Sequence, residues 1–132
     1  LLDLAVWRRF EMVINFPLPS REHLAAVVRD LLESLESSPW PDILGVALSG
    51  SSFSDAAQRV RRARRMSALN GGNVEQELGA IVKATAESLG RDAKQDLALR
   101  LMRDAGLSQR QASEITGVSR DTIRKHDQKI GA

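Results

Sequence analysis

Apolar residues recur at helical spacing along most of this 132-residue chain, and this periodicity limits the fold more than any other feature. Ser20 is a good helix N-cap, and the leucines and valines after it fall on one helix face. The residues of this face are Leu24, Val27, Val28, Leu31, Leu32 and Leu35. Serines and prolines at 37–41 end that helix, and comparable patterns predict helices at about 42–48, 54–69, 74–89, 92–105, 108–116 and 119–129. We therefore predict a mainly α-helical fold.

Only residues 11–16 have the pattern of a β-strand. Most of their side chains are bulky and favour strands, and Pro17 and Pro19 prevent the strand from continuing. Because everything after Pro19 is predicted to be helical, this strand has no partner strand within the chain.

The composition excludes several kinds of protein. The chain has no cysteine and only two histidines, which lie far apart, so we expect neither disulfides nor a metal site. No apolar run approaches the roughly 20 residues of a membrane span, and no secretory leader opens the chain. We predict a cytoplasmic protein without membrane contacts. The formal net charge is +2, and residues 91–132 carry nine basic against six acidic side chains, which is a mild indication of nucleic-acid binding.

The clearest motif is LSQRQASEITGVSRDTIRKHDQKI at 107–130. Ser108 and Ser119 are N-caps on either side of Gly117, where the chain can turn sharply. The motif resembles the helix-turn-helix of bacterial DNA-binding proteins, whose second helix enters the major groove. The resemblance implies a three-helix DNA-binding domain at 91–132 with the contact residues Gln109, Arg110, Ser119, Arg120, Thr122, Arg124 and Lys125.

Within this motif, Arg120 or Arg124 is suited to bind guanine through two hydrogen bonds, and Lys125 to bind phosphate. Gln109 and Arg110 are expected at the DNA backbone. The alternative is that the three-helix unit binds another protein or simply packs on the rest of the chain. Salt-dependent affinity for duplex DNA would distinguish these possibilities.

The start of the chain, LDLAVWRRFEMVINFPLP at 2–19, resembles the end of the nucleotide-binding core of AAA ATPases. In that family, a Leu-Asp-x-Ala-x-x-Arg-Arg-Phe segment precedes the last core strand, and a Pro-x-Pro turn opens a helical lid. The matching residues are Leu2, Asp3, Ala5, Arg8, Arg9, Phe10, Pro17 and Pro19. The resemblance implies that residues 1–19 end an ATPase core and that 20–90 form the lid. The partner strands of residues 11–16 would then precede Leu1.

Arg8 and Arg9 are the candidate catalytic residues. An arginine inserted from a neighbouring subunit stabilises the charge of a transferred phosphoryl group, and such arginine fingers accelerate hydrolysis by roughly 10³ to 10⁵. Trp7 and Phe10 on either side would fix the pair rigidly. The alternative is an ordinary exposed basic pair on a loop.

The lid resemblance continues at GSSFSDAAQRVRRA, residues 50–63, which is similar to the turn and helix that approach the adenine and ribose in AAA ATPases. Gly50, Ser52 and Asp55 match and are the candidate nucleotide-binding residues. Ser54 and Ala56 replace the family's commoner alanine and leucine. In all, the resemblance covers residues 1–89.

The chain contains neither a phosphate-binding loop nor the paired acidic residues that hold magnesium. If the resemblance holds, ATP and Mg belong to a full-length parent protein, an ATPase that forms rings from copies of itself. We expect the 132-residue chain alone neither to bind ATP tightly nor to hydrolyse it. The competing hypothesis is a stand-alone helix-turn-helix regulator whose first 90 residues form a helical dimerisation domain.

Five arginines lie within seven residues, at 59–65. This run could form a second phosphate or DNA surface, or it could sense nucleotide from the lid. A third possibility is a solvated helix face that pairs with acidic residues such as Glu33 and Glu36.

Overall fold

The computed structural model describes residues 18–35 and 37–131. The strand predicted at 11–16 and the candidate catalytic pair Arg8 and Arg9 lie outside these residues. Within the described ranges, the regular structure is entirely helical, as the apolar periodicity predicts.

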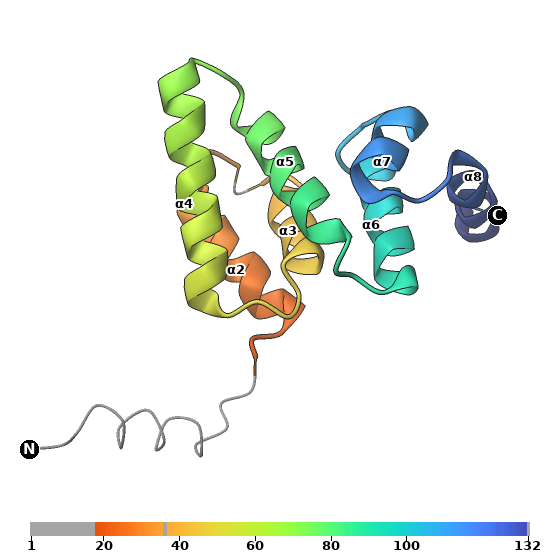
Figure 1. The fold of residues 1–132 in the computed structure, drawn as a ribbon, viewed down its shortest axis with the longest axis horizontal. Helices are drawn as coiled ribbons and strands as arrows, with labels where there is room; N and C mark the ends of the chain where they lie inside the picture. Colours follow the sequence, from red (N-terminus) through yellow and green to blue (C-terminus); the bar gives the residue numbers. More distant parts are fainter. Residues whose placement is uncertain (1–17, 36, 132) are drawn as a thin grey trace, which may run out of the picture.

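Seven α-helices and one short 3₁₀ helix follow one another along the described chain (Figure 1). They are α2 (Arg21–Leu31), η1 (Glu33–Leu35), α3 (Trp40–Ala47), α4 (Phe53–Asn70), α5 (Val74–Ala86), α6 (Arg91–Arg103), α7 (Gln109–Thr116) and α8 (Arg120–Gly131).

Polar side chains cap several of these helices at the expected places. The Ser20 hydroxyl accepts a hydrogen bond from the His23 N–H at 3.2 Å, and the Asn73 side chain accepts one from the Glu75 N–H at 2.9 Å. Each such cap satisfies one of the backbone N–H groups that the first turn of a helix leaves without a partner.

Several helix boundaries differ from the prediction. Helix α2 ends at Leu31, short of the predicted end at the serines and prolines of 37–41, and the 3₁₀ helix η1 follows it.

Helix α3 begins two residues early, at Trp40, because the Ser38 hydroxyl accepts its N–H at 3.3 Å and Pro41 is well tolerated in a first turn. Helix α5 ends at Ala86, and Gly90, expected to end it, is instead the N-cap residue of α6.

The helices are arranged around α3, which packs against α2, α5 and α6. Helix α4 packs on α2 and α5, and α7 packs on α5 and α6. Helix α8 rests on α6 and α7, so that α4 and α8 lie at opposite ends of the molecule (Figure 1).

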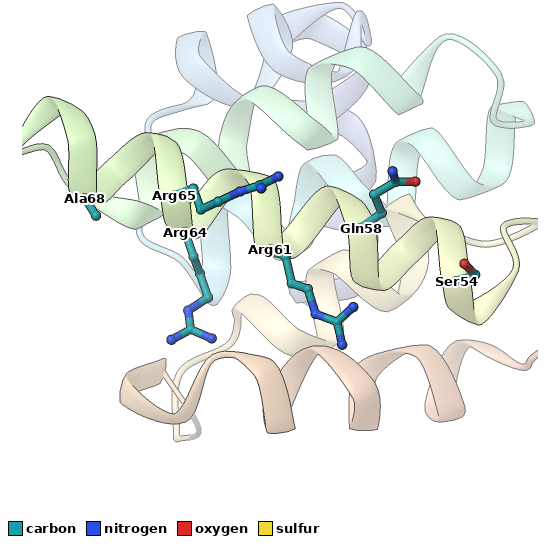
Figure 2. A pocket seen from close by; sticks show the side chains of 6 residues that line it. All are labelled: Ser54, Gln58, Arg61, Arg64, Arg65 and Ala68. Atoms are coloured by element: carbon teal, nitrogen blue, oxygen red, sulfur yellow. The ribbon is translucent and has the colours of Figure 1, made fainter.

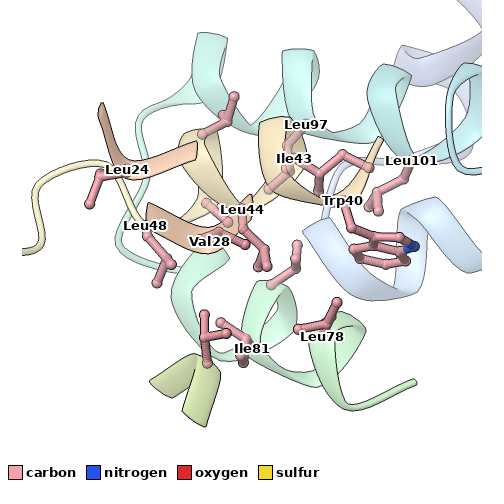
Figure 3. Packing of buried hydrophobic residues seen from close by; sticks show 14 of the residues in the cluster. Leu24, Val28, Trp40, Ile43, Leu44, Leu48, Leu78, Ile81, Leu97 and Leu101 are labelled. Carbon is pink, nitrogen blue, oxygen red and sulfur yellow. The ribbon is translucent and has the colours of Figure 1, made fainter. Parts of the chain in front are cut away.

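One hydrophobic core runs through both halves of the described chain. Leu24 of α2 and Ile43 of α3 are fully buried, and Leu97 and Leu101 of α6 join the same cluster (Figure 3). The cluster continues to Ile123 of α8. The boundary predicted near Gly90 therefore falls at a helix end across which the core is continuous.

Helices α2 and α3 approach each other closely at Gly45. A Cβ atom at this position would lie 2.6 Å from the backbone oxygen of Arg21 and 3.2 Å from the Ala25 Cβ. Only glycine fits this contact without displacing the α2 backbone.

None of the helices in the described part of the chain has the length and apolar character needed to cross a membrane.

Candidate nucleic-acid interface

Helices α7 and α8 meet at a corner within the segment whose sequence resembles a helix-turn-helix. A reciprocal capping box begins α7: the Gln111 N–H donates to the Ser108 hydroxyl at 3.1 Å, and the Ser108 N–H donates to the Gln111 side-chain oxygen at 2.9 Å. Gly117 ends α7 with φ of 78°, a left-handed conformation that glycine adopts at little cost. The chain thus turns between two capped helices at the position that the sequence indicates.

The interior of this corner contains one buried polar residue, Thr116. Its hydroxyl donates to the Ala112 carbonyl at 2.7 Å and accepts from the Val118 N–H at 3.2 Å. Ala112 and Ile123 are buried beside it. Because the hydroxyl both donates and accepts a hydrogen bond, a threonine is compatible with this apolar position.

Two sets of contacts fix α8 in place. At its start, the Ser119 hydroxyl accepts from the Thr122 N–H at 3.1 Å. Further along, Arg103 of α6 binds Asp127 through a 2.6 Å contact from Nε to Oδ1 and a 2.9 Å hydrogen bond from Nη2 to the backbone oxygen. This ion pair ties one face of α8 to α6, and the opposite face remains exposed.

The structure places the predicted DNA-contact residues on two neighbouring helices. Ser119, Arg120, Arg124 and Lys125 are exposed at or along α8, and Thr122 is half-buried. The other two, at 109 and 110, form the first turn of α7, where the glutamine is half-buried and the arginine is exposed.

Acidic neighbours offset part of the positive charge on this surface. Asp121 pairs with Arg124 and with Lys125, whose Nζ lies 3.3 Å from its carboxylate. The hydrogen bond from Arg124, followed by the contacts with Lys125, lowers the pKa of the Asp121 carboxyl. Sequence reasoning missed these pairs, although their spacing of three and four residues on a helix was a usable signal.

Arg110 is offset in the same way, since its Nε lies 3.3 Å from the Glu114 carboxylate. Arg120 differs, because no carboxylate in the described residues lies within ion-pair distance of its guanidinium. Among the predicted contact arginines, Arg120 is therefore the one most available to a ligand.

The candidate nucleotide-binding residues come together at the start of α4. Gly50 has φ of 91°, and the Ser52 hydroxyl caps α4 by accepting from the Asp55 N–H at 3.1 Å. Asp55 is exposed in the first turn, where the helix dipole favours a negative charge. This cap accounts for Ser52 and Asp55 without a nucleotide.

The five arginines of α4 are all exposed. Three of them line an open groove of about 730 Å³, in which Arg61 and Arg64 extend from the same edge of the helix (Figure 2). Pairing with Glu33, one of the possibilities for these arginines, does not occur, and Glu36 lies outside the described residues.

No cluster of three or more potential metal-binding side chains occurs in the described part of the chain. No protein-family model matches the sequence, and the searches of curated proteins and of solved structures gave no significant match.

Proposed function

We propose that this chain binds duplex DNA through α8 and forms the C-terminal part of an AAA-type ATP-hydrolysing ring protein. The observation that carries the DNA-binding part is the geometry of α7 and α8. Two capped helices meet at the left-handed Gly117, and the exposed face of the second helix presents Arg120. A helix held in this way has the shape and donors that major-groove recognition requires.

The basic residues of α8 differ in their ion pairs, and we expect them to contact different parts of the DNA. Arg120 has no intramolecular carboxylate partner among the described residues, so its guanidinium is available for two hydrogen bonds to guanine. Lys125 shares Asp121 with Arg124 and remains exposed, which suits a contact with phosphate.

The test is selection of preferred sequences from random duplexes, followed by fluorescence anisotropy at several salt concentrations. For the selected site, Arg120→Gln is expected to cost about 1 to 3 kcal/mol of binding energy and to relax the preference at one base pair. Lys125→Gln is expected to weaken binding to all DNA sequences alike and to reduce the slope of log affinity against log salt by about 1.

Arg91→Gln removes the same charge from an exposed position at the start of α6 and serves as the matched control. It should leave the base preference unchanged. If selection enriches no sequence, or if Arg91→Gln has the same effect as Arg120→Gln, α8 does not read DNA.

The ring-ATPase part of the proposal rests on the sequence resemblance at 1–89, with Arg8 or Arg9 acting on the nucleotide of a neighbouring subunit. Gly50, Ser52 and Asp55 would lie near that lid's own nucleotide. Of these, Asp55 lines a groove of about 740 Å³ together with Arg59, Arg62 and Arg65, and the three guanidinium groups support an anionic ligand in this region.

The coding sequence upstream of Leu1 tests this part directly. We expect it to encode, in frame, a phosphate-binding loop and a paired acidic motif. A stop codon and a ribosome-binding site directly upstream would instead favour the stand-alone regulator.

A further inference from the structure

Helix α4 concentrates the positive charge of the chain. It carries five arginines and a single carboxylate, Asp55. The whole chain has 19 basic and 17 acidic residues, so the chain without α4 has a net negative charge. Helix α4 therefore carries a larger net positive charge than any other helix of the described chain.

The arginines of α4 have no acidic partners among the residues that the structure describes. This contrasts with α8, where Arg124 and Lys125 share Asp121. Several of the α4 arginines are also three or four residues apart, as Arg61 is from Arg64 and Arg65, and like charges at this spacing destabilise a helix. An external anion would relieve this repulsion.

The α4 side chains form two grooves on the exposed part of the helix. One is lined by Ser54, Gln58 and Ala68 together with Arg61, Arg64 and Arg65 (Figure 2). The second groove is lined by Arg59, Arg62 and again Arg65, together with Ser51, Asp55 and Gln58. Guanidinium groups bind phosphate oxygens through paired hydrogen bonds, and a row of them suits a ligand with repeated phosphates.

Other polyanionic surfaces fit α4 less well. Among the described residues, none that lines either groove is aromatic, so these residues offer no platform for stacking the bases of a single strand. The apolar face of α4, with Ala56, Val60 and Ala63, is buried in the core. The apolar side chains that α4 exposes, Phe53, Met66 and Leu69, lie near its two ends and do not form a continuous face that could enter a lipid bilayer.

We infer that the arginine face of α4 is a second, sequence-independent site for the phosphate backbone of duplex DNA. The choice of DNA as the ligand rests on the proposed function of α8, whereas the anion-binding character of α4 does not. Because α4 and α8 lie at opposite ends of the molecule (Figure 1), one chain can hold two DNA segments at once.

The test compares three forms of the full chain by anisotropy with an unselected 20-bp duplex across a salt series. The first replaces Arg61, Arg64 and Arg65 by glutamine, and the second carries Arg120→Gln and Arg124→Gln. The third, with Lys83, Arg91 and Lys94 replaced by glutamine, is the control of equal charge change outside α4 and α8. The α4 variant is expected to reduce the slope of log affinity against log salt by about 2 to 3, since each phosphate contact contributes about 0.9.

A capture experiment tests the two-site arrangement. Wild-type protein bound to an immobilised duplex should retain a second, labelled duplex, and both the α4 and the α8 variants should lose this capture. The α8 variant could instead retain both capture and the wild-type slope of log affinity against log salt, while the α4 variant loses them. In that case the proposed function of α8 fails and the α4 site stands.

The inference is overturned if the α4 variant has the same salt slope as the equal-charge control, or if it still captures a second duplex. It is also overturned if polyglutamate of equal charge displaces DNA from α4 as well as competitor DNA does, which would identify an acidic protein as the partner. Circular dichroism of the α4 variant should match wild type, because all its replaced side chains are exposed.

Discussion

The hydroxyl of Thr116 is buried at the corner between α7 and α8, where it donates to the Ala112 carbonyl and accepts from the Val118 N–H. The second bond matters more than the first. The Val118 N–H follows the left-handed Gly117 and lies outside any helix, so no carbonyl of a helical ladder is available to it. A buried N–H without a partner costs the full penalty of its desolvation.

We therefore expect Thr116→Val, which preserves the shape of the side chain, to lower the free energy of unfolding by about 1 to 3 kcal/mol. Urea denaturation followed by circular dichroism measures this change. Under conditions in which the variant is fully folded, its affinity for DNA should change little, because Thr116 is buried and does not reach the exposed face of α8.

Thr85→Val in α5 is the matched control. The Thr85 hydroxyl donates to the Ile81 and Val82 carbonyls of its own helix, and no N–H of the described residues donates to it. Its replacement should cost less than about 1 kcal/mol. Equal costs for the two substitutions would contradict the role given to the Val118 N–H.

Within α8, the same aspartate stabilises the helix and opposes the binding of DNA. Asp121 stabilises α8 by pairing with Arg124 and Lys125, yet it places a negative charge beside the predicted DNA. We expect Asp121→Asn to raise affinity for duplex DNA by about three- to tenfold, because it removes a negative charge that repels the DNA phosphates. Anisotropy at low salt measures this gain, and Asp30→Asn on α2, also exposed, is the control for net charge.

The pH dependence of this effect follows from the lowered pKa of Asp121. The carboxylate stays charged from pH 8 to pH 5, so the advantage of the asparagine variant should be constant over that range. The ion pairs stabilise α8 above the ordinary aspartate pKa of about 3.9, and this contribution is lost as the pH falls through the lowered pKa. A gain from Asp121→Asn that vanishes between pH 7 and pH 5 would contradict this assignment.

Helices could be predicted from sequence because the signals that start and end them are local. The apolar face after Ser20, the cap at Asn73 and the turn at Gly117 each depend on a few neighbouring residues. Ion pairing between elements could not be predicted in this way. Arg103 and Asp127 are 24 residues apart, and only the packing of α8 on α6 brings them together.

The whole molecule shows the same limit at a larger scale. A change in charge and a glycine suggested a domain boundary near Gly90, and these are local features of the sequence. Burial depends on which helices pack together, and α6 packs on α3 while α7 packs on α5. The core therefore passes from the predicted lid into the predicted DNA-binding domain, which the composition on either side of Gly90 could not reveal.

A shared core makes the two parts unfold together. Leu101 of α6 is fully buried in the same cluster as Trp40 of α3 (Figure 3). We expect Leu101→Ala to lower the free energy of unfolding by about 2 to 5 kcal/mol. In a Trp7→Phe background, the fluorescence of Trp40 and the helical circular dichroism should shift to lower urea by the same amount, in one transition.

Leu69→Ala in α4 is the control for loss of a leucine side chain, because Leu69 is 81% exposed and should change stability by less than about 0.5 kcal/mol. The contrary result would be that Leu101→Ala leaves the urea midpoint of Trp40 fluorescence unchanged and shifts only part of the circular dichroism transition. Residues 20–90 and 91–132 would then unfold as separate domains. A single transition would instead mean that a ligand on α8 stabilises α4 as well, since binding to the folded state stabilises every part that unfolds with it.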